Sequence, residues 1–145
     1  MEAVAPNSQE TKPAFAVGTR GKNQTEEQLN LKVAKKLEQR LKELGADVYM
    51  TRTEAKTDMS NIDRAEFANR LNADIMIRIH ADGSSNKNTR GISMLVPTND
   101  YINNASLVEK SERAGKIILE EVIAQTGAVT RGIIKRSDLT GFNWS

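Results

Sequence analysis

Segments of helical periodicity alternate along this chain with segments of strand periodicity, and this order is the strongest constraint on its fold. Apolar residues at helical spacing predict helices over residues 25–44, 60–71 and 106–125. Alternation of helices and strands is typical of a mostly parallel sheet with helices packed on both faces, so we expect an α/β fold. The expected strands are 46–52, 74–80, 91–96 and 131–135.

The expected helices have recognisable starts and ends. Each starts at a Ser or Thr that can cap the backbone, with a polar partner three residues on. Glycine follows the first and the last helix, where a left-handed residue would end them. The capping pairs are Thr25–Gln28, Ser60–Asp63 and Ser106–Glu109, and the glycines are Gly45 and Gly127.

Length and composition predict one ordinary globular domain. The chain has 145 residues, of which 38% are hydrophobic and 28% are charged, which is enough for a core. Residues 1–24 lack a sustained apolar period, so we expect an irregular N-terminal arm or loop there and the domain core over 25–145. Residues 138–145 are expected to form a loop.

Charge and hydropathy disfavour two classes of partner. The net charge is +2, aromatic residues make up 4%, and no stretch interleaves aromatics with Lys or Arg, so nucleic acid is disfavoured. No apolar run approaches the length of a membrane span, and a polar segment rather than a signal peptide follows Met1. The oligomeric state is left open.

The chain contains no cysteine and one histidine, which narrows its chemistry. Disulfides, thiolate metal sites and a Cys–His pair are excluded, so any metal would be held by imidazole and carboxylate. No G-x-S-x-G, P-loop or G-x-G-x-x-G motif is present. Glycoside hydrolysis by two carboxylates stays open, because 19 acidic residues offer many pairs.

The single histidine, His80, ends the expected strand 74–80. Ligands collect at the carboxyl ends of strands in open α/β sheets, so His80 is a candidate metal ligand or proton carrier. The alternative is that it bonds a nearby carbonyl. Glu26 and Glu27, in the first turn of the first helix, are candidate second ligands. Their alternative role is to complement the helix dipole.

Several blocks of residues follow one another in the order and spacing of a known family. The blocks are Glu26–Ala34, Met50–Arg52, Arg64–Asn69, Asn72–Ile75, Ile79–Asp82, Thr126–Gly127, Arg131–Gly132 and Thr140–Trp144. Together they resemble the zinc-dependent N-acetylmuramoyl-L-alanine amidases of the type 3 class, especially the clostridial and sporulation-associated branch. The likeness runs from about residue 18 to the end.

The resemblance implies a fold and a metal site. Glu26 and His80 stand where two of the family's Zn²⁺ ligands stand. The family's first histidine ligand, in an Asp-x-Gly-His motif on an opening strand, has no counterpart here. Its catalytic glutamate, on a closing strand, would lie beyond Ser145, so no catalytic residue is assigned within the chain. We therefore expect an amidase/phosphorylase-hydrolase-like domain that lacks its first and last strands.

The resemblance also implies a function. A family member is a peptidoglycan hydrolase, an autolysin or sporulation enzyme, that cleaves the amide between N-acetylmuramic acid and L-alanine with a zinc-activated water. Its expected location is extracellular, in the cell wall or the spore envelope. The alternative is a non-catalytic fragment or a wall-binding remnant with an incomplete metal site. With two ligands, one fewer than usual, we expect this chain to bind zinc weakly and to have little activity.

Other residues in the matching blocks are expected to have structural roles. Arg52, Arg64, Asn69 and Asn30 should orient helices and loops through hydrogen bonds. Asp82 is either a hydrogen-bond partner that fixes the His80 ring or a turn former before Gly83. Arg78, where many relatives have serine, is expected to be structural rather than to contact the substrate.

Overall fold

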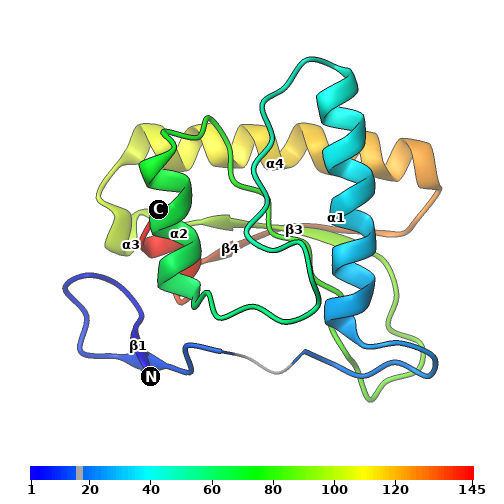
Figure 1. Cartoon of the computed structure of the whole chain (residues 1–145), viewed down its shortest axis with the longest axis horizontal. Coiled ribbons are helices and arrows are strands. Elements are labelled where there is room, and N and C mark those ends of the chain that lie inside the picture. The colour runs from blue at the N-terminus through cyan, green and yellow to red at the C-terminus, as the bar shows by residue number, and fades with distance from the viewer. Residues whose placement is uncertain (16–17) are drawn as a thin grey trace. The chain divides into compact units, whose positions relative to one another are not determined.

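The computed structural model describes residues 1–15 and 18–145, and the chain forms two compact units (Figure 1). One unit comprises residues 1–14 and 86–145. The other comprises residues 15–85, apart from the two that are not described. The expected boundary between an arm and a core at residue 24 stays a prediction.

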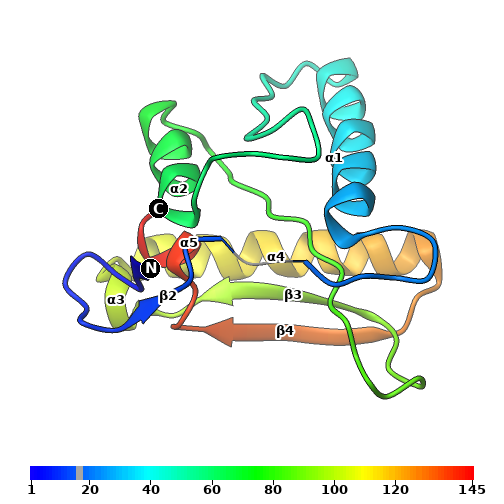
Figure 2. The ribbon, with the colours of Figure 1, turned by 60° about the horizontal axis from the view of Figure 1, so that its bottom comes forward.

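The unit of residues 1–14 and 86–145 is built around a strand–helix–strand arrangement. Strands β3 (Ile92–Pro97) and β4 (Thr130–Arg136) pair in parallel, with Leu95 opposite Ile134, and helix α4 (Ala105–Thr126) connects them across one face of the pair (Figure 2). Parallel neighbours require such a crossover. The two strands expected near 91–96 and 131–135 are therefore confirmed.

Helix α4 lies very close to this sheet because it carries Gly115 at the contact. Gly115 and Leu119 are buried in α4, and Val96 of β3 is 2% exposed. A Cβ atom added at Gly115 would lie 2.9 Å from Cγ1 of Val96 and 3.0 Å from Cγ of Met94. The absence of a side chain at this position therefore sets how closely the helix approaches the strand.

The start of α4 differs from the expected one. Asn104, not Ser106, caps the helix, because its Oδ1 accepts the backbone N–H of Leu107 at 3.1 Å. A short helix, α3 (Asn99–Ile102), precedes it, and the Oδ1 of Asn99 accepts the N–H of Asn104 at 2.7 Å, which fixes the cap. The expected capping box at Ser106 is therefore wrong. The expected end of α4 at Gly127 is confirmed, because Gly127 has a left-handed φ of 65°.

The first residues of the chain pack against the last ones in the same unit. Strands β1 (Glu2–Ala3) and β2 (Thr11–Lys12) pair antiparallel, and Val4 is fully buried. The expected loop 138–145 instead contains a short helix, α5 (Thr140–Asn143). Sequence periodicity could not find this helix because it is only four residues long and is held by distant backbone groups.

In the unit of residues 15–85, two helices appear where they were expected. They are α1 (Glu26–Glu43) and α2 (Asn61–Arg70). Ser60 and Asp63 cap α2 reciprocally, through contacts of 2.8 and 3.2 Å. The expected capping box of Thr25 and Gln28 is present at α1, and Gln28 accepts the backbone N–H of Thr25 at 3.2 Å.

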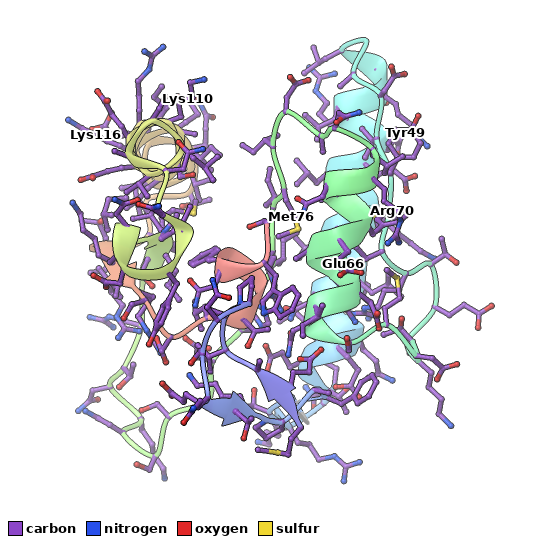
Figure 3. The ribbon with its side chains drawn as sticks, turned by 90° about the vertical axis from the view of Figure 1, so that its left-hand side faces the viewer. Tyr49, Glu66, Arg70, Met76, Lys110 and Lys116 are labelled. Atoms are coloured by element: carbon purple, nitrogen blue, oxygen red, sulfur yellow. The ribbon has the colours of Figure 1, made fainter. Side chains whose placement is uncertain are left out.

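The outer face of α2 carries an ion pair at helical spacing. Glu66 and Arg70 lie four residues apart on this helix, and their charged groups are 3.7 Å apart (Figure 3). Both side chains are well exposed. Such a pair adds a few tenths of a kcal/mol, about 0.3–0.5, to the helix.

The strands expected over 46–52 and 74–80 are wrong: neither segment is paired in a sheet. Hydrophobic alternation identifies a segment that can extend, but a strand also needs a hydrogen-bonded neighbour, and none of the described residues supplies one. The alternation is visible in burial only over residues 75–78. Met76 and Arg78 are half-buried, whereas Ile75 and Ile77 are 53% and 42% exposed.

The expected architecture is therefore only partly visible. The described residues form two sheets of two strands each, one antiparallel and one parallel, so a mostly parallel sheet with helices on both faces is not confirmed. Within residues 1–15 and 18–145, no helix combines the length and apolarity needed to cross a membrane.

Candidate functional site

The side chains of Glu26 and His80 meet within the unit of residues 15–85. Nδ1 of His80 lies 3.2 Å from Oε1 of Glu26. Glu26 is the first residue of α1, and His80 is the last residue of the run 74–80. The Glu26 side chain is 9% exposed, whereas that of His80 is 59% exposed. A buried carboxylate and a solvent-facing imidazole thus share one small site.

The Glu26 carboxylate is held by several donors besides His80. Oε2 accepts the backbone N–H of Thr19 at 2.9 Å. Oε1 accepts the backbone N–H of Ala81 at 3.1 Å and Nδ2 of Asn30 at 3.3 Å. Asn30 is buried one helical turn beyond Glu26, so it fixes the carboxylate from within the same helix. The orientation of both carboxylate oxygens is therefore set before any ligand binds.

These donors keep Glu26 ionised. Burial acts to raise the pKa of the carboxyl group, but it is outweighed by the hydrogen bonds from the N–H groups of Thr19 and Ala81 and from His80 and Asn30. Together they lower the pKa of Glu26 from 4.5 to about 2. Hydrogen bonds to the charged form favour that form. Glu26 is therefore an anion throughout the physiological pH range.

The pair has the donor chemistry that zinc takes in proteins. Imidazole nitrogen and carboxylate oxygen are both zinc donors. The observed separation of 3.2 Å between Nδ1 of His80 and Oε1 of Glu26 is that of a direct hydrogen bond between the two side chains. In the part of the chain that the structure describes, no group of three or more His, Cys, Asp or Glu side chains gathers as a metal site.

The arginines expected to be structural do bind backbone and side-chain oxygens. Arg52 donates to the carbonyl oxygens of Glu27 at 2.7 Å and Glu54 at 2.9 Å, which ties its loop to α1. Arg64 donates to the hydroxyl of Thr51 at 3.2 Å and to the carbonyl of Met59 at 3.3 Å. Arg64 is half-buried, and burial together with the nearby charge of Arg52 lowers its pKa.

The remaining candidates lie outside the Glu26–His80 contact. Arg78 donates to Oδ1 of Asn61 at 2.7 Å, in line with a structural role. Asp82 makes no hydrogen bond to His80 in the described part of the chain, and the ring faces Glu26 instead. Glu27 has an exposed side chain, and its contribution is the carbonyl that Arg52 binds. Thr19 was missed because nothing in its irregular segment distinguishes it.

An anionic carboxylate and an imidazole held in contact define a candidate cation site of the kind used by metal-dependent hydrolases. The sequence assigns the chain to a particular family. Residues 9–145 match the N-acetylmuramoyl-L-alanine amidase family, and the chain belongs to it.

Two curated relatives and one solved structure extend this comparison. The chain is 33% identical over 100 residues to N-acetylmuramoyl-L-alanine amidase AmiA of Salmonella typhimurium, and 32% identical over 101 residues to AmiA of Escherichia coli. These matches cover 68% and 70% of this chain, but the chain spans only about a third, 34%, of each relative.

The solved structure is the catalytic domain of CwlV, an N-acetylmuramoyl-L-alanine amidase from Bacillus (Paenibacillus) polymyxa var. colistinus. It superposes with a TM-score of 0.68 at 22% identity, over 91% of this chain and 67% of that one. This likeness supports the amidase fold.

Proposed function

We propose that this chain acts on peptidoglycan, as a hydrolase of the amide between N-acetylmuramic acid and L-alanine, with Zn²⁺ held by Glu26 and His80. The observation that carries the proposal is the 3.2 Å contact of these two side chains in a chain that belongs to the amidase family. We further propose the clostridial and sporulation-associated branch, and a location in the cell wall or spore envelope.

Glu26 and His80 have different roles in the proposed site. Glu26 supplies a permanent negative charge whose direction is fixed by Thr19, Ala81 and Asn30. His80 supplies a ring nitrogen on the solvent-exposed side, where a polymeric substrate can approach. When bound, zinc would supply a Lewis acid that polarises the amide carbonyl and makes water acidic enough to attack at neutral pH.

The experiment is digestion of purified peptidoglycan with added zinc, followed by mass spectrometry of the released stem peptides. Amidase action predicts peptides with a free L-alanine amino group and glycan chains that keep an intact lactyl group. Because two donors should hold zinc weakly, we expect stem peptides to be released slowly. Release should be abolished in Glu26→Gln and in His80→Gln. Glu27→Gln, one position away and exposed, is the matched control and should keep the wild-type rate.

Two other outcomes would contradict the proposal. Release of stem peptides at the same rate from wild type and from Glu26→Gln would show that another site or a contaminant does the chemistry. Co-sedimentation with peptidoglycan without any release would instead favour a non-catalytic wall-binding protein.

A further inference from the structure

Thr19 contacts Glu26 and also Ala81, the residue that directly follows His80. Its backbone N–H donates to Oε2 of Glu26 at 2.9 Å, and its own carbonyl oxygen accepts the backbone N–H of Glu26, also at 2.9 Å. This reciprocal pair closes the segment between residues 19 and 26. Thr19 is thereby fixed to the start of α1 by backbone groups, which most substitutions retain.

The side chain of Thr19 reaches the segment that carries His80. Its single hydroxyl proton lies within reach of two acceptors, the carbonyl oxygen of Ala81 at 2.9 Å and Oε2 of Glu26 at 3.2 Å. Ala81 directly follows His80, and its own N–H donates to Oε1 of Glu26 at 3.1 Å. The peptide groups on both sides of Ala81 are therefore held, one by Glu26 and one by Thr19.

The methyl group of Thr19 lies beside Gly83, in the same segment after His80. A Cβ atom added at Gly83 would lie 2.8 Å from Cγ2 of Thr19. The methyl group therefore occupies the space that a side chain at position 83 would need, so glycine at this position lets the segment after His80 approach Thr19. The hydroxyl and the methyl of one residue thus both act on residues 81–83.

We propose that Thr19 is the positioning residue that holds the segment after His80 against the Glu26 carboxylate and so sets the spacing of the two metal donors. Its hydroxyl fixes the Ala81 peptide, and its N–H aligns the carboxylate. The expected effect on zinc affinity rests on the proposed function. The hydrogen bond between Thr19 and Ala81 is present without metal, so it can be measured in the metal-free protein. Residues that orient metal ligands affect metal affinity strongly without touching the metal.

The test compares Thr19→Val with Thr19→Ser. Valine keeps the shape and the methyl group but removes the hydroxyl, while serine keeps the hydroxyl. In the metal-free protein, we expect Thr19→Val to shift the backbone amide resonance of Ala81 and to speed the hydrogen exchange of this amide. The resonances of the other unit, residues 1–14 and 86–145, should stay unchanged. Thr19→Ser should retain the wild-type resonance. Gly83→Ala, which crowds the methyl, should shift the Ala81 amide as well.

Zinc affinity is the second readout, measured by calorimetry on the same proteins. We expect Thr19→Val to weaken zinc binding by about tenfold, the lower end of the range for residues that orient metal ligands. Thr19→Ser should restore the affinity to within about twofold of wild type.

The two readouts separate the two proposals. If the wild type binds no zinc, the proposed metal function fails, and the Ala81 amide alone decides the role of Thr19. An unshifted Ala81 amide in Thr19→Val, or a valine variant that binds zinc like wild type, overturns the positioning role. A serine variant that behaves like valine does so too, because the hydroxyl would then not be the group responsible.

Discussion

Asn143 donates from its side-chain Nδ2 to the backbone carbonyl of Val4, 139 positions earlier, at 3.1 Å. The same Nδ2 also donates to the carbonyl of Ser137 at 2.8 Å, and Asn143 is 5% exposed. One buried amide thus fastens the N-terminal segment to the end of β4. Beside it, the indole N–H of Trp144 donates to the carbonyl of Ala3 at 3.1 Å.

Asn143→Ala should loosen this junction. Removal of the amide leaves two buried or half-buried carbonyl groups without their donor, which costs about 1–3 kcal/mol of unfolding free energy. Trp144 is the single tryptophan of the chain, so its fluorescence during urea unfolding reports on this junction directly. Ser145→Ala, which removes a hydroxyl that bonds only the nearby carbonyls of Gly141 and Phe142, is the control and should change stability by less than about 0.5 kcal/mol. Equal midpoints for the two variants would contradict the prediction.

Asp138 should make the same unit sensitive to acid. Hydrogen bonds from Arg136 first, and then from Lys12, hold the pKa of Asp138 well below its ordinary value of 3.8. The contacts run from 2.6 to 2.7 Å. Because the folded pKa is the lower one, the stabilisation is fully present above pH 3.8. It is lost as the pH falls from there toward the folded value.

The stability of wild type is compared with that of Asp138→Asn by urea unfolding at several pH values from 7 down to 2, with Trp144 fluorescence as the signal. At pH 7 the variant should be less stable, by no more than about 1 kcal/mol, because the charged groups are about two-fifths exposed and solvent screens them. The difference should shrink as the pH falls below 4. A difference that stays constant across this range would show that the loss is one of packing rather than charge.

Gly115→Ala should destabilise the strand–helix–strand arrangement. The added methyl would meet Val96 at 2.9 Å and Met94 at 3.0 Å, and overpacking of this kind costs about 1–3 kcal/mol. Alanine recovers up to about 1 kcal/mol through its higher helix propensity, so the net change is a loss. Thermal melting followed by circular dichroism measures it. Ala124→Gly, on the exposed side of α4, gives the propensity effect alone. A higher melting temperature for Gly115→Ala would show that α4 does not rest on β3.

Local signals in the sequence were sufficient for the helices but not for the sheet. The α1 and α2 boundaries follow from apolar spacing and capping residues, which act within one turn. The runs 46–52 and 74–80 have strand-like patterns, yet pairing depends on residues far away in the chain. Likewise, the short helix α5 and the burial of Val4 depend on contacts between the two ends of the sequence.

The candidate site, too, could be predicted only in part from the sequence. Composition limited any metal donors to imidazole and carboxylate, but 19 acidic residues left the partner of His80 open. Glu26 was chosen by family resemblance rather than by spacing, and the structure brings its carboxylate to His80 across 54 positions. Thr19 carries no sequence signal, because its role depends on the fold of the segment after His80.

The most direct measurement is zinc binding by equilibrium dialysis at neutral pH for wild type, Glu26→Gln, His80→Gln and Glu27→Gln. If Glu26 and His80 share one ion, wild type should bind one zinc, and loss of either residue should weaken binding by at least about tenfold, since even loss of a residue that only orients a ligand costs about 10–100-fold. Glu27→Gln should bind as wild type does. Equal zinc affinity in wild type, Glu26→Gln and His80→Gln would contradict the account.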